Sequence, residues 1–151
     1  MAHRELYRNS TVAFALIGML LITACNQNMS VPGVYANTKD AVRKTGTLYI
    51  TGNPYNGWLF ELNDNRDTLA LTPFINGKEY GEARQWWPNR QLREVRYYKE
   101  GKKVGTHTGW WPNGQKKFEY HFVDDEFEGT VTDWFENGQV YRIYHYSKGH
   151  E

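Results

Sequence analysis

The sequence predicts an all-β protein, an elongated antiparallel β-meander of about four tandem hairpin repeats. Three observations lead to this prediction. Similar residues recur every 24 positions from Gly57 onward in the 151-residue chain. An aromatic content of 16% and 14 glycines favour short strands joined by many turns. Apolar and polar side chains alternate within the blocks, which is the pattern of strands with one better-buried face.

The first residues of the chain are typical of a secretory signal. Arg4 and Arg8 precede an uncharged apolar stretch at residues 11–24. This stretch is shorter than the ~20 apolar residues that a helix needs to cross a bilayer. We therefore expect residues 1–24 to be a lipoprotein signal peptide.

The chain has one cysteine, which follows the apolar stretch directly in the string Leu21-Ile22-Thr23-Ala24-Cys25. This string resembles the lipobox of bacterial lipoproteins. The resemblance implies that Cys25 is lipidated and anchors the chain to a membrane of the cell envelope. Because Asn26 follows in place of Asp, it also favours the outer membrane where the cell has one. The alternative is an ordinary secretion signal with a stray cysteine.

The residues after the cysteine predict a tether and then a folded domain. Residues 25–45 are polar, rich in small side chains and include Pro32, so we expect a flexible tether. Alternation in residues 46–51 indicates an extra edge strand. The repeat domain is expected to span residues 46–151, and packing alone must hold it because one cysteine forms no intrachain disulfide.

The repeat itself is defined by residue types at fixed positions of the 24-residue block. An aromatic pair stands at the sixth and seventh positions of the last three blocks, Asn at the ninth of all four, an aromatic at the eighteenth, and Gly or Asp at the twenty-first. The first block is the most degenerate. The blocks start at Gly57, Gly81, Gly105 and Gly129.

Each block reads as one β-hairpin. The aromatic pair runs into Asn113-Gly114 in the third block, a dipeptide that favours a tight two-residue turn. The following residues 117–122 alternate as a returning strand does. Arg90 replaces the turn glycine of the second block and Asp125 the spacer glycine of the third, so we expect those turns to be distorted.

Three motifs of the repeat are Trp110-Trp111-Pro112-Asn113-Gly114-Gln115, Trp134-Phe135-Glu136-Asn137-Gly138-Gln139 and, between blocks, Lys99-Glu100-Gly101-Lys102. These motifs resemble bacterial MORN-type repeats of the variant found in YwqK-like proteins. The resemblance covers residues 77–149 well and residues 57–76 poorly. It implies an all-β scaffold that contacts proteins or membranes, and it implies no catalytic residue. The antitoxin label of that group fits poorly with an exported lipoprotein.

The charge pattern argues against a nucleic-acid partner. Without residues 1–24 the chain carries 16 basic and 16 acidic side chains, and a neutral domain binds nucleic acid poorly. Residues 78–117 nevertheless carry ten Lys and Arg against four Asp and Glu, whereas residues 118–151 carry two against eight. This segregation is either two solvated faces of opposite sign or a bipolar surface used for docking or self-association.

No pattern in the sequence points to an enzyme, a cofactor or a dedicated metal site. His121 and His145 share a repeat position and His150 lies nearby, but two imidazoles do not complete a metal site. A cluster of acidic residues lies in one predicted turn, and it consists of Asp124, Asp125, Glu126 and Glu128. We interpret this cluster as a solvated turn, because it lacks the ligand spacing of a calcium-binding loop.

The candidate binding residues are Trp87, Trp111 and Phe135, which we call the aromatic row. Adjacent aromatics in a strand point to opposite faces, so one row packs the core and the other is available for stacking or for a partner. The alternative is that both rows pack on neighbouring hairpins. The sequence therefore predicts a membrane-anchored, non-enzymatic repeat lipoprotein that acts as a protein-interaction scaffold. A glycan- or peptidoglycan-binding module is the alternative.

Overall fold

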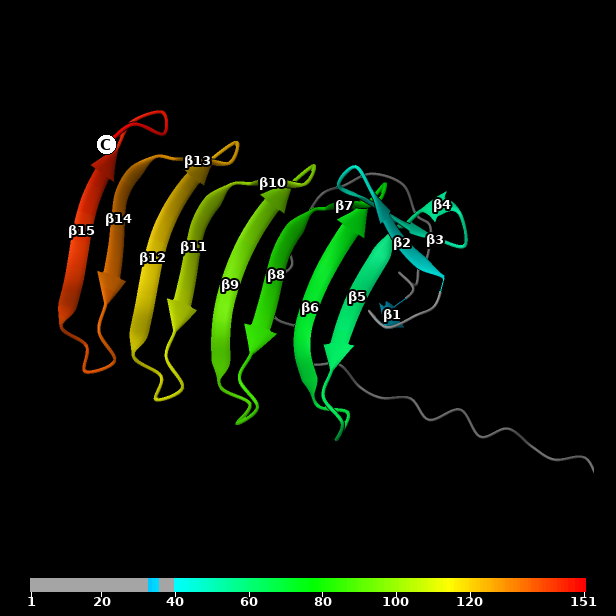
Figure 1. Ribbon diagram of the computed structural model, residues 1–151, viewed down its shortest axis with the longest axis horizontal. Coiled ribbons are helices and arrows are strands. Elements are labelled where there is room, and N and C mark those ends of the chain that lie inside the picture. Colours follow the sequence, from blue (N-terminus) through cyan, green and yellow to red (C-terminus); the bar gives the residue numbers. More distant parts are fainter. Residues whose placement is uncertain (1–32, 36–39) are drawn as a thin grey trace, which may run out of the picture.

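The computed structural model describes residues 33–35 and 40–151, and this part of the chain is built from strands. A twelve-stranded sheet and a separate three-stranded sheet contain all of its named elements. Figure 1 shows the long strands side by side in one curved layer. The all-β meander predicted from the sequence is confirmed. Across the described ranges, none of the chain forms a helix long and apolar enough to cross a membrane.

Four hairpins, which we call repeats 1 to 4, make up most of the large sheet. They start at the four glycines that the 24-residue period predicts. The short strands β7 (Lys78–Glu79), β10 (Lys102–Lys103) and β13 (Glu126–Phe127) fold back on the end of each of the first three hairpins. The hairpins are β5 (Gly57–Leu62) with β6 (Thr68–Ile75), β8 (Gly81–Trp86) with β9 (Leu92–Lys99), β11 (Gly105–Trp110) with β12 (Lys116–Val123), and β14 (Gly129–Trp134) with β15 (Val140–Tyr146).

Strand pairing is long within each hairpin and short between hairpins. Within repeat 2, β8 and β9 share six residue pairs. The joint between β9 and β11 has two, Thr108 with Val95 and Gly109 with Glu94, and the other two joints also have two. Strand pairing between neighbouring hairpins is therefore confined to two residue pairs at each joint. Elsewhere along the joint between β9 and β11 the strands diverge, and the His107 side chain lies between them.

The hairpin turns have three loop residues, so the predicted two-residue turn is wrong. In repeat 3 the Gly114 N–H donates to the Trp111 carbonyl (2.9 Å) and the Trp111 N–H donates to the Gln115 carbonyl (2.8 Å). Gly114 has φ +85°, while Asn113 is not among the residues with positive φ. This is a type I turn followed by one left-handed residue. The Asn113 side chain instead accepts the Gln115 N–H (2.9 Å), which holds the turn closed.

The two replaced glycines leave the turns undistorted, contrary to the prediction. Arg90 has φ +68° and donates its N–H to the Trp87 carbonyl (2.8 Å), as Gly114 does in its own turn. Asp125 has φ +76°, close to the +82° of Gly101 at the same repeat position. Asp is one of the few side chains that tolerate this region, and local contacts hold both residues in it.

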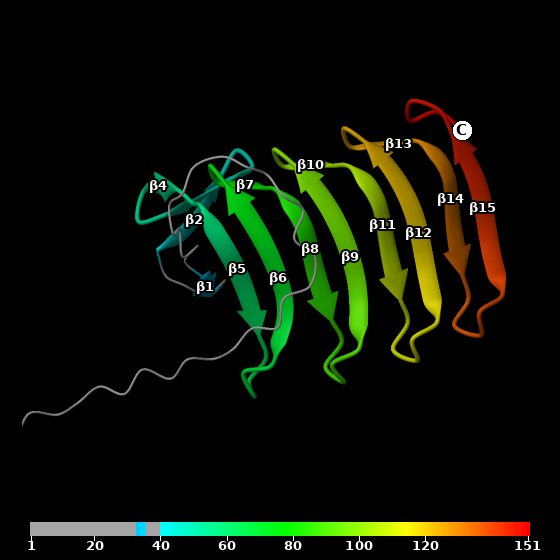
Figure 2. The same cartoon turned by 180° about the vertical axis from the view of Figure 1, so that it is seen from behind.

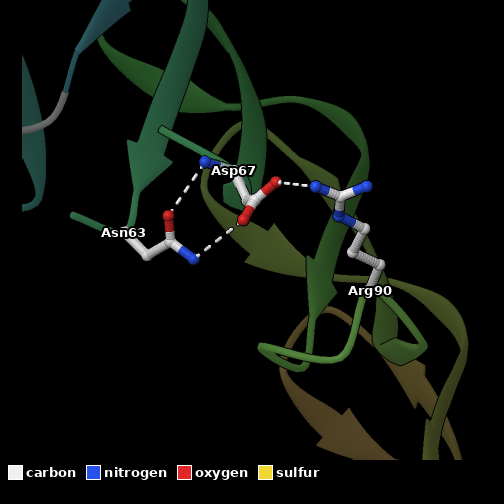
Figure 3. A network of polar contacts seen from close by, with 3 residues as sticks. All are labelled: Asn63, Asp67 and Arg90. Carbon is white, nitrogen blue, oxygen red and sulfur yellow. Dashed lines mark hydrogen bonds and ion pairs between the residues drawn. The ribbon is translucent and has the colours of Figure 1, made fainter. Parts of the chain in front are cut away.

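Arg90 gains a contact that glycine lacks, a link between the turns of repeats 1 and 2 (Figure 3). Its Nη2 lies 2.6 Å from Asp67 Oδ1. Asn63 holds the same Asp67, because its Nδ2 donates to Oδ2 (3.3 Å) and its Oδ1 accepts the Asp67 N–H (2.9 Å). These hydrogen bonds, from Asn63 first and Arg90 second, lower the pKa of Asp67.

At the edge opposite the hairpin turns, a backbone hydrogen bond links the end of each repeat to the segment that precedes that repeat. The N–H at the twenty-first position donates to a carbonyl 22 residues earlier in every repeat. Asp125 keeps this bond and adds a second, because its carboxylate accepts the Lys103 N–H (2.8 Å). The four bonds run from Gly77 to Tyr55 (2.7 Å), Gly101 to Glu79 (2.9 Å), Asp125 to Lys103 (3.0 Å) and Gly149 to Phe127 (3.0 Å).

The residues before the first repeat cover one end of the array. β1 (Gly33–Tyr35) pairs with β5 in parallel, and β2 (Ala41–Lys44), β3 (Thr47–Ile50) and β4 (Asn53–Pro54) form the small sheet. Figure 2 shows this sheet at the β5 end, far from β15. The strand predicted at residues 46–51 is thus β3, in a separate sheet, and the predicted tether contains β1 and β2. The predicted signal peptide and the predicted lipidation site Cys25 lie outside the described residues.

The best-buried cluster sits where the small sheet meets repeat 1. Leu48, Tyr55 and Phe74 have exposed fractions of 3%, 6% and 2%. The Leu48 N–H donates to the Gly77 carbonyl (2.7 Å) and the Leu48 carbonyl accepts the Tyr55 N–H (2.9 Å). Apolar burial and backbone hydrogen bonds therefore hold the small sheet against the array.

Candidate functional site

The aromatic row lies just after β8, β11 and β14, and two of its members link repeats. Trp87 Nε1–H donates to the carbonyl of Trp110 (3.0 Å), and Trp111 Nε1–H donates to the carbonyl of Trp134 (3.1 Å). Both side chains are half-buried. Each indole therefore bonds the repeat that follows it.

A cationic side chain also lies over the ring of each of these two tryptophans. Arg93 Cζ lies 5.0 Å from the centre of the Trp87 ring, and Lys117 Nζ lies 4.5 Å from that of Trp111. Such contacts are attractive because the ring face is electronegative. A sugar that stacked on those faces would have to displace the cations. The geometry favours the interpretation in which these tryptophans pack on neighbouring hairpins.

Phe135, the third member of the row, lies beside β15, the last strand of the described sheet. It contacts Tyr141, with ring centres 4.8 Å apart and ring planes at 66°. It belongs to a group of large apolar side chains that are about half exposed, which we call the C-terminal apolar edge. The members are Phe135 (49%), Val140 (50%), Tyr141 (58%) and Ile143 (51%).

The acidic turn between β12 and β14 has structural partners. Asp125 accepts the Lys103 N–H, as above, and Glu128 Oε2 accepts the Lys148 N–H (2.8 Å). Lys102 Nζ lies 3.9 Å from Asp124. Within the described ranges, no three His, Cys, Asp or Glu side chains lie together as a metal site would require.

The repeated histidines pair with threonines across the hairpins. Thr106 Oγ1 lies 2.8 Å from His121 Nδ1, and Thr130 Oγ1 lies 3.1 Å from His145 Nδ1. His150 forms a short bridge with Ser147 at the last turn. These contacts repeat with the 24-residue period, which points to a role in the sheet.

Two further polar groups on the sheet form internal pairs. Glu94 is buried, and its Oε2 accepts from Arg96 Nη2 (2.7 Å) and Nε (3.0 Å). Tyr120 Oη donates to Asp133 Oδ1 (2.6 Å), and burial, followed by this bond, raises the pKa of Tyr120 to about 12. Such pairing lets charged and polar groups lie inside a thin sheet.

The residue that the sequence reading missed is His107, which is 2% exposed. Its ring lies between Tyr98 (centres 5.8 Å apart) and Phe122 (4.6 Å). Its Nε2 lies 3.1 Å from the amide nitrogen of Tyr97, where β9 and β11 have separated. The signal was present in the sequence, because the third repeat position is apolar in the other blocks, as Ala83 and Val131 show.

His107 should make the fold sensitive to acid. Burial lowers its pKa, and the nearby cations Arg96 and Lys103 act in the same direction. The unfolded chain therefore takes up this proton first as pH falls. Stability from neutral His107 is fully present above the unfolded value of 6.5 and is lost below it, by up to about 1.4 kcal/mol per pH unit.

Urea unfolding between pH 8 and pH 5 measures this loss. The variant His107→Leu, which keeps an apolar side chain at the site, should lack the component that begins near pH 6.5. His145→Leu is the matched control, because it removes an imidazole from an exposed position outside the ring contacts of His107. Identical profiles for the parent and His107→Leu would contradict the assignment.

The comparisons with known proteins agree with the repeat geometry. Residues 103–124 and 127–148 match the family model described as MORN repeat variant. The two segments are 24 residues apart and cover most of repeats 3 and 4. Neither a curated protein nor a solved structure matches the chain. Two adjacent segments of the chain are thus similar to the MORN repeat variant, a repeat type that is typically non-catalytic and commonly contacts proteins or lipids.

Proposed function

We propose that the chain is a lipid-anchored, non-enzymatic scaffold of the cell envelope that binds another envelope protein through its last repeat. The anchor rests on Cys25 and the lipobox-like residues before it. Acyl chains supply about 0.8 kcal/mol per buried methylene, enough for two or three chains to hold a protein at a membrane. The preferred location is the outer membrane of a cell that has one.

The observation that carries the binding proposal is the difference between the two ends of the array. At the first end, β1 pairs with β5 and the small sheet packs beside it. At the last end, β15 is the terminal strand of the sheet and carries the C-terminal apolar edge. Half-exposed apolar side chains at the unpaired edge of the described sheet are typical of a docking surface.

The occupant that fits this edge is a strand from a basic partner protein. In the earlier joints, the residues equivalent to Arg142 and Ile143 pair with the next hairpin, so β15 offers the same backbone groups to an added strand. Residues 118–151 carry eight acidic and two basic side chains. A second copy would bring like charges together, whereas a strand with Lys or Arg beside apolar residues complements this end.

One experiment tests the anchor and the edge together. A photoreactive amino acid replaces Tyr141 at the apolar edge or, as a matched control, Tyr80, which is 41% exposed near the small sheet. Each chain is expressed in bacteria with Cys25 intact or with Cys25→Ser. We expect the Tyr141 probe alone to form an adduct with one envelope protein in the membrane fraction. We expect Cys25→Ser to release the chain from membranes and to abolish the adduct.

Mass spectrometry then identifies the partner and the crosslinked segment. An extended segment with Lys or Arg beside apolar residues supports the proposal, and Ile143→Glu should remove the adduct. Adducts of equal yield from Tyr80 and Tyr141, or an adduct with a second copy of the chain, would refute the edge. Membrane retention of Cys25→Ser would refute the lipid anchor.

A further inference from the structure

A hollow of about 370 Å³ lies on the sheet across the joint between repeats 2 and 3. This volume is within the range of about 300–1,000 Å³ typical of small-ligand sites. Residues of three neighbouring strands, β8, β9 and β11, line the hollow. It is lined by Glu82, Arg84, Leu92, Val95, Tyr97, Thr106, Thr108 and Trp110.

The hollow exists at this joint because of local replacements in the repeat. At the next joint, Lys116 Nζ lies 5.5 Å from the centre of the Trp134 ring and forms an ion pair with Glu119. At the hollow, the residues in the same repeat positions as Lys116 and Glu119 are Leu92 and Val95. The hollow therefore has an apolar lining beside the half-buried indole of Trp110.

The other side of the hollow is a fixed polar rim. Tyr97 Oη donates to Glu82 Oε2 (2.7 Å), and Arg84 Nε donates to the other carboxylate oxygen. Partial burial opposes ionisation of Glu82, but the hydrogen bonds from Tyr97 and Arg84 outweigh it and lower the pKa of Glu82. The rim thus presents a carboxylate and a guanidinium whose charges cancel, with hydrogen-bond donors and acceptors held in place.

We infer that this hollow binds one unit of a neutral saccharide, with an apolar sugar face on Trp110 and hydroxyls bonded to Glu82 and Arg84. A pyranose combines an apolar C–H face with a rim of hydroxyls that both donate and accept, which matches an indole opposite a neutral polar rim. The site is separate from the aromatic row, and it depends neither on the lipid anchor nor on the C-terminal apolar edge.

A peptide fits the hollow less well than a sugar. Strands β8, β9 and β11 each pair with a neighbour on both sides. Where β9 and β11 separate beside the hollow, the Tyr97 N–H donates to His107 Nε2 (3.1 Å) and the Tyr97 carbonyl accepts the Val104 N–H (2.9 Å), so a peptide backbone would find few main-chain partners there. Peptide recognition by sheets normally uses main-chain hydrogen bonds at an edge.

The test titrates the full chain, purified in a detergent without a sugar headgroup, with chitotetraose and cellotetraose. The readout is the indole N–H resonance of Trp110 in ¹⁵N-labelled protein, assigned with Trp110→Phe. We expect saturable shifts of this resonance, with a dissociation constant on the order of 1 mM for so open a site. The absence of a saturable shift with either sugar, while the chain is folded, would overturn the inference.

The repeat supplies a matched pair of variants. Thr106→Arg fills the hollow, and Thr130→Arg places the same side chain at the same position of the next repeat, outside the hollow. Both threonines are half-buried and contact a histidine, so the two changes cost the fold similar contacts. We expect Thr106→Arg to weaken sugar binding roughly tenfold or more and Thr130→Arg to change it less than about twofold.

Equal weakening by the two arginine variants would overturn the site. Tighter binding of a tetrapeptide such as tetraalanine, with shifts at the same indole, would replace the saccharide by a peptide. If Thr106→Arg unfolds, Thr108→Gln tests the same hollow with a smaller side chain, and the Trp110 resonance of the parent still decides the question.

Discussion

Replacing Phe122 with alanine should lower the free energy of unfolding by about 3–5 kcal/mol. Phe122 is 6% exposed and contacts both neighbouring parts of the array. Its ring centre lies 4.6 Å from that of His107 and 4.7 Å from that of Phe127, and Lys103 Nζ lies 5.1 Å away. Phe127 in turn contacts Tyr146 of the last repeat (5.0 Å). Loss of the ring leaves a cavity where repeats 3 and 4 meet.

Urea unfolding followed by tryptophan fluorescence measures this effect. Phe135→Ala is the matched control, since it removes the same side chain from a position that is 49% exposed. We expect a loss below about 1 kcal/mol for that variant, because little apolar area leaves contact. Losses of similar size in the two variants would contradict the assignment of Phe122 to the core.

Replacing Gly77 with alanine should destabilise the chain by about 2–5 kcal/mol, and mainly at its first end. A Cβ at Gly77 would lie 2.5 Å from the Leu48 carbonyl oxygen and 2.4 Å from Thr47 Cγ2. The residue also has φ +75°, which costs a side chain about 1–2 kcal/mol. The backbone must shift to relieve this overlap, which costs about 1–3 kcal/mol more. The hydrogen bond from the Leu48 N–H to the Gly77 carbonyl is the contact that gives way.

Hydrogen exchange at the Leu48 amide and a thermal melt test this second effect. Gly101→Ala is the control at the same repeat position, with φ +82° but its nearest neighbour atom 3.7 Å from the added Cβ. We expect it to cost about 1–2 kcal/mol and to leave Leu48 protected. Faster exchange of Leu48 in Gly101→Ala, or unchanged exchange in Gly77→Ala, would show that the overlap is not what couples the small sheet to the array.

The repeats could be predicted because each hairpin is determined by residues that lie close together in the sequence. An aromatic recurs at the eighteenth position because every hairpin packs the same point of its returning strand, fully buried at Phe74 and Phe122 and half-buried at Tyr98 and Tyr146. Period and alternation together therefore placed all four hairpin starts. The turn type was missed because Asn-Gly suits two hairpin turns, and the choice depends on strand pairing around Gly114 that a dipeptide does not encode.

The structure before Gly57 and the role of the aromatic row depend on contacts between distant segments. β1 pairs in parallel with β5, and Leu48 meets Gly77, through residues that share no periodic signal. Trp87 and Trp111 lie in the turns, where strand alternation no longer fixes which way a side chain points. The hollow beside Trp110 arises from two changes within the repeat, Leu92 and Val95, which a search for shared positions passes over.

The contrast between six residue pairs inside a hairpin and two at each joint makes the array mechanically uneven. Each hairpin resists deformation as a unit, whereas a joint has few backbone hydrogen bonds to bend or stretch, so curvature changes concentrate at intervals of 24 residues. The hollow spans one such joint, between β9 and β11. Thr108 and Val95 are paired at this joint, so bending there would mainly move Thr106 relative to Tyr97. Tension on the array would then change the width of the hollow, and a bound ligand would in turn resist the bending.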